Sequence, residues 1–221
     1  MSQHLVLAGG GHCHALLLRR WAMQPHRRPQ GLITLVNRQS TTLYSGMVPG
    51  LIAGHYPRDA VAIDLLRLSD QAGVALVVAE ITGLDPVEKQ LHLKGRLSLT
   101  YDCLSLNVGS VTTLAEHACC DSELAIKPLE PALEALHAEQ HSNRYELPVQ
   151  IRGSGLAAIE LAFAIRHRWP QRPVALRAHL QHIAWPLQGA LKATGIDLRP
   201  VSKTAQSAQE TTHNDTSAPA L

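Results

Sequence analysis

Two short glycine-rich segments are the parts of this sequence best suited to binding chemistry. Gly9-Gly10-Gly11 stands between the apolar residues 5–8 and 15–18, and Gly153-Ser154-Gly155 follows residues 149–152. A strand, a glycine turn and a helix in this order offer free backbone N–H groups and the positive end of a helix dipole to a pyrophosphate. Gly9 would permit the tight bend, and Gly11 would let the backbone approach a phosphate closely. We predict two dinucleotide-binding turns; the alternative is a plain tight turn between strand and helix.

Such turns usually carry a third small residue, and here the two turns differ. Ala158 is a usual replacement in the second turn, whereas the first turn has the bulkier His14. We expect that the first helix lies farther from its strand, or that this ring points outward. His12, Cys13 and His14 also invite interpretation as a metal site, but alternate residues of a tight turn rarely converge on one ion. We predict no metal site.

A polar residue at the end of the second strand of such a unit usually binds the adenosine ribose. In the first unit this residue is Asn37, whose amide oxygen can accept a hydrogen bond from a hydroxyl group. In the second unit it is Arg177, which would suit the 2′-phosphate of NADPH. A surface arginine at a strand end is the equally weighted alternative.

Composition excludes several classes of protein. The 221 residues are 45% hydrophobic and 4% aromatic, with a net charge of +2 that is scattered along the chain, which does not favour nucleic-acid binding. We find no apolar run of roughly 18 residues and no signal-peptide pattern, so we expect a cytoplasmic protein without a transmembrane segment. The four cysteines form no C-x-x-C pair, which argues against zinc or a redox dithiol. Cys103, in an apolar stretch, is expected to be buried.

The hydrophobic pattern predicts strands that alternate with helices, as in parallel α/β sheets. The expected strands are 5–8, 32–36, 74–79, 101–106, 149–152, 174–177 and 196–199, and the expected helices are 13–23, 60–72, 131–140, 157–168 and 187–194. An antiparallel hairpin over 81–93 interrupts the alternation, and the polar tail 202–221 should be disordered.

Further motifs accompany the glycine turns. They are Tyr44-Ser45-Gly46-Met47-Val48-Pro49-Gly50, Tyr101-Asp102, Asn107-Val108-Gly109-Ser110, Lys127-Pro128 and Glu160. Together the motifs, over about residues 4–200, resemble the pyridine nucleotide–disulfide oxidoreductase superfamily of two-dinucleotide flavoproteins. More narrowly, they resemble the NADH-dehydrogenase-like flavoprotein module associated with selenide, water dikinase.

The resemblance implies a fold and a set of site residues. Residues 1–145 would be a Rossmann-like FAD-binding domain with the antiparallel hairpin as an insert, and 146–201 a partial Rossmann-like NAD(P)-binding domain. The residues expected to contact FAD or NAD(P)H are Gly9, Gly10, Gly11, His12, His14, Asn37, Tyr44, Gly46, Pro49, Asn107, Gly109, Lys127, Gly153, Gly155, Glu160 and Arg177. The segment from Tyr44 to Gly50 would run beside the flavin.

The implied activity is hydride transfer from NAD(P)H to FAD, followed by reoxidation by a small-molecule or quinone-like acceptor. No residue stands out as a general acid or base. The resemblance implies a C-terminal return to the FAD domain that carries a Gly-Asp pair; this sequence contains no Gly-Asp pair, and a complementing chain or a homo-oligomer would supply the missing part. The alternatives are a non-enzymatic or vestigial dinucleotide-binding protein and an ordinary NAD(P)-dependent dehydrogenase. The Tyr44–Gly50 segment and the hairpin argue against the latter.

Overall fold

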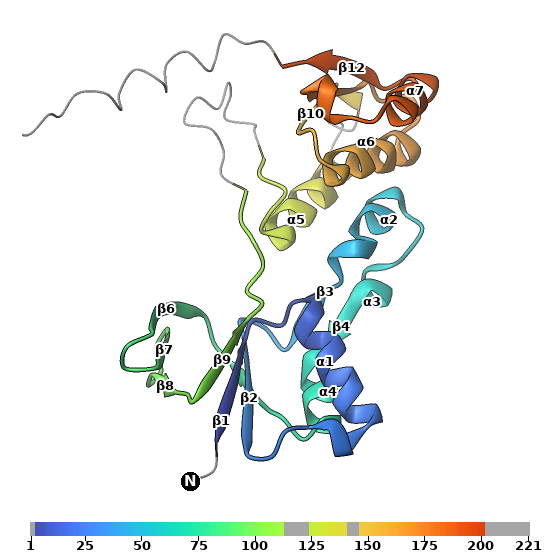
Figure 1. Ribbon diagram of the computed structural model, residues 1–221. Coiled ribbons are helices and arrows are strands. Elements are labelled where there is room, and N and C mark those ends of the chain that lie inside the picture. Colours follow the sequence, from blue (N-terminus) through green and yellow to red (C-terminus); the bar gives the residue numbers. More distant parts are fainter. Residues whose placement is uncertain (1–2, 113–123, 141–145, 202–221) are drawn as a thin grey trace, which may run out of the picture. The chain divides into compact units, whose positions relative to one another are not determined.

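A computed structural model describes residues 3–112, 124–140 and 146–201 (Figure 1). The chain divides into two compact units, Met1–His141 and Ser142–Leu221. The tail predicted over 202–221 lies outside the described residues.

A parallel four-stranded sheet forms the centre of the first unit. Its strands are, in spatial order, β5 (Ala75–Val78), β2 (Leu32–Asn37), β1 (His4–Ala8) and β9 (Cys103–Leu106). The strands of such a sheet end at one edge, so the glycine turn after β1 lies between the ends of β2 and β9. In the register, Ala8 of β1 is opposite Val36 on one side and Leu106 on the other.

The two faces of this sheet are covered differently (Figure 1). On one face lie α1 (His12–Met23) and α4 (Leu65–Gln71), whose Leu18 and Leu65 are fully buried with Leu7 and Leu35 of the strands. On the other face lies the antiparallel sheet of β6 (Ile81–Asp85), β7 (Gln90–Leu93) and β8 (Leu99–Thr100). The expected hairpin over 81–93 is confirmed, and β8 adds a third strand to it.

The prediction of one helix over 60–72 is wrong for the residues before Leu65. The structure has α3 (Arg58–Val61), then β4 (Ala62–Asp64), and only then α4. β4 pairs in antiparallel fashion with β3 (Thr41–Leu43), and Asp64 caps α4 by accepting a hydrogen bond from the Arg67 N–H. This pairing partner is distant in sequence, so periodicity alone could not show the break. The predicted helix end is confirmed, because Gly73 follows α4 with φ +65°.

Four further helical segments belong to the described part of the first unit. They are the 3-10 turns η1 (Pro25–Arg27) and η2 (Ser45–Met47) and the α-helices α2 (Val48–Ala53) and α5 (Leu129–Gln140). An ion pair joins Arg58 of α3 to Glu130 of α5. The segment before α5 pairs with the segment after β9, since the Thr112 N–H donates to the Lys127 carbonyl at 3.1 Å.

The second unit is a parallel three-stranded sheet with two helices. It contains β10 (Val149–Arg152), α6 (Leu156–Arg168), β11 (Val174–Ala178), the 3-10 turn η4 (Leu180–His182), α7 (Trp185–Ala193) and β12 (Asp197–Pro200). Every predicted helix and strand of this region is present, with ends within two residues of those expected. The α/β fold class is therefore confirmed.

Candidate functional site

The first glycine turn is packed tightly against the chain that follows β9. Gly9 has φ +90°, and a Cβ atom there would lie 2.3 Å from the Asn107 carbonyl oxygen. A Cβ atom on Gly11 would lie 2.2 Å from the Asn107 Oδ1 atom. No other residue fits at either position without moving this segment. The two glycines are thus required by the protein's own packing, before any ligand is considered.

Two asparagine side chains hold the turn from its two sides. The Gly10 N–H donates to Asn37 Oδ1 at 2.9 Å, and the Cys13 N–H donates to Asn107 Oδ1 at 3.1 Å. The amide nitrogen of Asn37 donates in turn to the Gln39 carbonyl at 2.8 Å. The oxygen of Asn37 that we expected to hold a ribose is therefore already engaged in shaping the turn.

The start of α1 keeps donors for an anion. Gly11 is the N-cap of α1, no side chain caps the helix through it, and the first turn has no acidic residue. In the part of the chain that the structure describes, the N–H groups of Gly11 and His12 have no hydrogen-bond partner. Two donors at the positive end of a helix dipole form a suitable site for a phosphate.

His14 does not point outward, so of the two alternatives expected for this residue the outward-pointing ring is wrong. The residue is 3% exposed, with its Nδ1 atom 2.6 Å from the Gly9 carbonyl oxygen and its Nε2 atom 2.9 Å from Ser105 Oγ on β9. Burial lowers the pKa of His14 because it disfavours the charged ring, and the hydrogen bond to Gly9 offsets this only in part. Protein groups occupy both ring nitrogens, so neither remains for a cofactor.

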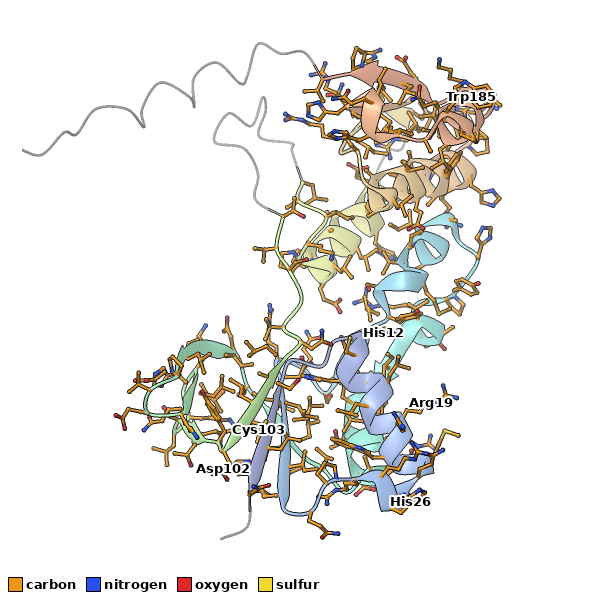
Figure 2. All side chains as sticks on the ribbon, viewed as in Figure 1. His12, Arg19, His26, Asp102, Cys103 and Trp185 are labelled. Carbon is orange, nitrogen blue, oxygen red and sulfur yellow. The ribbon has the colours of Figure 1, made fainter. Side chains whose placement is uncertain are left out.

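An aromatic stack joins α1 to the motif that begins at Tyr44. The rings of His12 and Tyr44 stack with their centroids 4.7 Å apart and their planes at 25°. His12 lies at the N-terminal end of α1 (Figure 2). A Cβ atom on Gly46 would lie 3.0 Å from the Tyr44 ring, so this glycine leaves room for the ring to fold back. Pro49 occupies the first turn of α2. The structure thus brings the Tyr44 motif to the edge of the glycine turn.

Two more predicted residues lie beyond β9. Gly109 has φ +81°, and nothing lies within 4 Å of an added Cβ atom, so its left-handed backbone and not crowding favours glycine. The Lys127 Nζ atom donates to Ser110 Oγ at 3.0 Å. Lys127 is thus held beside the Asn107–Ser110 segment.

Cys103 was expected to be buried, and this is wrong. It is exposed at the start of β9, which is one of the two edge strands of the four-stranded sheet in the described residues (Figure 2). The neighbouring Asp102 accepts a hydrogen bond from the His4 N–H at 2.7 Å. An apolar sequence pattern could not show that this strand lies at an edge.

The second glycine turn is more open than the first. The Gly153 N–H donates to the Arg177 carbonyl at 3.0 Å, and a Cβ atom there would lie 2.9 Å from that of Ala158. Gly155 is the N-cap of α6, and an added Cβ atom would meet nothing within 4 Å. Glu160 is exposed on α6. A ligand could approach the backbone of this turn directly.

Arg177 is only partly exposed at the end of β11. Its Nε atom is buried and has no hydrogen-bond partner among the described residues. A buried donor without a partner is costly, which makes this guanidinium a candidate for an anionic ligand.

No group of three or more His, Cys, Asp or Glu side chains is placed to hold a metal ion within the described ranges. None of the helices seen there is long and apolar enough to cross a membrane.

No protein-family model matches the sequence. Among solved structures, the chain is similar to the sulfide:quinone oxidoreductase of Aquifex aeolicus, with a TM-score of 0.68 and 18% identity over 90% of this chain and 51% of that one. It is also similar to the NADH:rubredoxin oxidoreductase of Clostridium acetobutylicum, with a TM-score of 0.66 and 20% identity over 91% of this chain and 53% of that one. A third similar structure is CoADR-RHD of Bacillus anthracis, with a TM-score of 0.72 and 16% identity over 90% of this chain and 38% of that one.

These proteins are pyridine nucleotide–disulfide oxidoreductases. Our chain has their fold. The α/β fold that the superfamily resemblance predicts is confirmed, whereas the narrower link to selenide, water dikinase remains a prediction. The chain spans about half or less of the length of these oxidoreductases.

Proposed function

We propose that this chain is part of an FAD-dependent NAD(P)H oxidoreductase. Residues 1–145 would bind FAD at the first glycine turn, and residues 146–201 would bind NAD(P)H at the second. When bound, FAD takes a hydride from NAD(P)H and passes the electrons to an acceptor. The observation that carries the proposal is the first turn, where Gly11 and His12 keep free N–H groups at the start of α1.

Each group around the first turn has a defined task in this proposal. The N–H groups of Gly11 and His12 bind the pyrophosphate, and the dipole of α1 adds about 0.3–1 kcal/mol for a negative charge near its end. Asn37 and Asn107 hold the turn in its shape. The stacked rings of His12 and Tyr44 lie beside the turn. Gly46, Pro49, Gly109 and Lys127 lie on the segments that would border the flavin.

In the second unit we assign NADPH in preference to NADH. Gly153 and Gly155 shape the turn that receives the pyrophosphate, and Glu160 lies on the following helix. Arg177 supports the assignment, because its partly buried guanidinium has an unsatisfied Nε donor at the strand end where the adenosine ribose usually binds. A 2′-phosphate would supply the missing acceptor.

We infer a small-molecule or quinone-like acceptor. The similar protein from Aquifex aeolicus is a sulfide:quinone oxidoreductase, and its name supports a quinone. The described cysteines, Cys13 and Cys103, are free thiols, and they give no reason to assign a disulfide as acceptor.

The visible absorption spectrum tests the proposal. The purified chain is incubated with excess FAD and desalted, and free FAD passed through the same column is the control. We expect a retained flavin band that bleaches anaerobically with NADPH, and more slowly with NADH. A colourless protein would refute FAD binding by this chain. A retained flavin band that neither NADPH nor NADH bleaches would indicate that the chain binds FAD but does not transfer a hydride.

A further inference from the structure

The peptide group between Gly9 and Gly10 is held at both of its polar atoms by side chains. Its carbonyl oxygen, on Gly9, lies 2.6 Å from His14 Nδ1, and its N–H, on Gly10, donates to Asn37 Oδ1 at 2.9 Å. A peptide between two glycines has little steric resistance to rotation, because neither residue has a Cβ atom. Rotation of this peptide would break both hydrogen bonds and change the shape of the turn.

The geometry assigns the proton on His14. A carbonyl oxygen only accepts hydrogen bonds, so Nδ1 must carry the hydrogen that it donates to Gly9. In the neutral ring Nε2 is then an acceptor, and it receives the hydroxyl hydrogen of Ser105 on β9 at 2.9 Å. The ring therefore bridges the turn after β1 to a strand 91 residues later.

We propose that His14 is a positioning residue for the dinucleotide site: as a neutral Nδ1–H imidazole it fixes the Gly9–Gly10 peptide, together with Asn37, and ties the turn to β9 through Ser105. The effect on binding rests on the proposed function, whereas the bridge itself does not. A small residue usually stands at this position of the turn, so a bridging histidine is a feature of this chain.

The surroundings keep the ring neutral. The titratable side chains beside it in sequence or on β9 are His12, Cys13 and Cys103, and Asp102 directly precedes β9; all four are exposed. None of them is hydrogen-bonded to the ring, whose two nitrogens bond only to Gly9 and Ser105 among the described residues. With no carboxylate at hand, protonation would place an uncompensated charge at a site that is 3% exposed.

Two variants separate positioning from simple packing. His14→Asn keeps an amide N–H near the place of Nδ1, whereas His14→Ala removes the donor and leaves the buried Gly9 carbonyl unpaired. We expect His14→Ala to weaken FAD binding about tenfold or more, the effect of one unsatisfied buried group. His14→Asn should bind within about threefold of wild type, since the donor is retained. Equal weakening in both variants would overturn the proposal, as would full affinity in His14→Ala.

The protonation state is measured without any cofactor. Proton–nitrogen correlation spectra of the full chain with 15N-labelled histidine, assigned by the signal lost in His14→Asn, should show a neutral ring with the hydrogen on Nδ1. A hydrogen on Nε2, or a charged ring at neutral pH, would overturn the bridge. If His14→Ala does not fold, Ser105→Ala serves instead: it should keep the Nδ1–H form and shift the Nε2 resonance, and an unchanged Nε2 resonance would refute the link to β9. Failure of wild type to bind FAD would refute the proposed function and leave these spectra decisive for the bridge.

Discussion

The open approach to Gly155 allows a sharp test of nicotinamide binding. Gly155 has extended backbone angles of φ −83° and ψ 165°, which alanine also adopts, and an added Cβ atom meets nothing within 4 Å. Gly155→Ala should therefore fold. Alanine stiffens the unfolded chain, which contributes about 0.4–1 kcal/mol to stability. It is also a poorer N-cap than glycine, which costs a similar amount. We expect a net change in the free energy of unfolding within about 0.5 kcal/mol.

Binding should respond far more strongly than stability. In the proposed function a phosphate would approach the first N–H groups of α6 beside Gly155, where an added Cβ atom meets only open space, so a methyl group there would obstruct it. Losing one charge-assisted hydrogen bond there costs about 1.5–3 kcal/mol, which corresponds to a roughly 10- to 150-fold weaker Kd for NADPH.

The assay is calorimetric titration with NADPH beside a thermal melt followed by circular dichroism. Gly189→Ala is the matched control, because Gly189 is an exposed residue of α7 whose added Cβ atom also meets nothing within 4 Å. This control should bind NADPH as wild type does, and it should be stabilised by about 0.5–1 kcal/mol. A Gly155→Ala protein that binds NADPH with wild-type affinity would refute the assignment of the second turn to NADPH.

Three further predictions follow from other contacts. Arg177→Gln should weaken NADPH binding about tenfold and change NADH binding less than about twofold, because only NADPH has the 2′-phosphate; equal losses measured by titration would contradict this. Gly9→Ala should unfold the first unit or lower its Tm strongly, because the new Cβ atom meets the Asn107 backbone at 2.3 Å; a wild-type melting curve would contradict it. The lowered pKa of His14 predicts full stability above pH 6.5 and a decline as pH falls below it, because the unfolded chain then binds a proton that the folded chain does not. Denaturant titrations from pH 7.5 to 5 should show a weaker decline in His14→Asn than in wild type.

Local patterns were sufficient to predict most of the helices and strands. The buried strand β2 and the amphipathic α1 were expected from runs of apolar residues, and both are present. Prediction failed where a distant segment decided the local structure. β4 exists because β3 pairs with it, and Asp64 then begins a new helix within what looked like one continuous helical stretch.

The same distinction explains what the sequence could predict about the first turn. Its glycines and its polar neighbour Asn37 were visible in the sequence. Their roles were not, because those roles depend on groups from three strands that meet at one sheet edge. Asn107 lies 94 residues along the chain from Cys13, whose N–H donates to it, and Ser105 lies 91 residues from His14. The sequence did contain one signal, a histidine where a small residue is usual, and only the structure shows that it points inward.

The two turns differ in a way that matches the cofactors proposed for them. In the first turn, side chains of Asn37, Asn107 and His14 hold the backbone before any ligand arrives. In the second turn Ser154 Oγ accepts a hydrogen bond from the His179 N–H at 2.8 Å, and the space around Gly155 is open. A site that is already shaped loses less conformational entropy on binding, and so it favours a ligand that stays bound. An open turn favours a ligand that enters and leaves in each cycle. This contrast supports FAD as the resident cofactor of the first unit and NADPH as the exchanging substrate of the second.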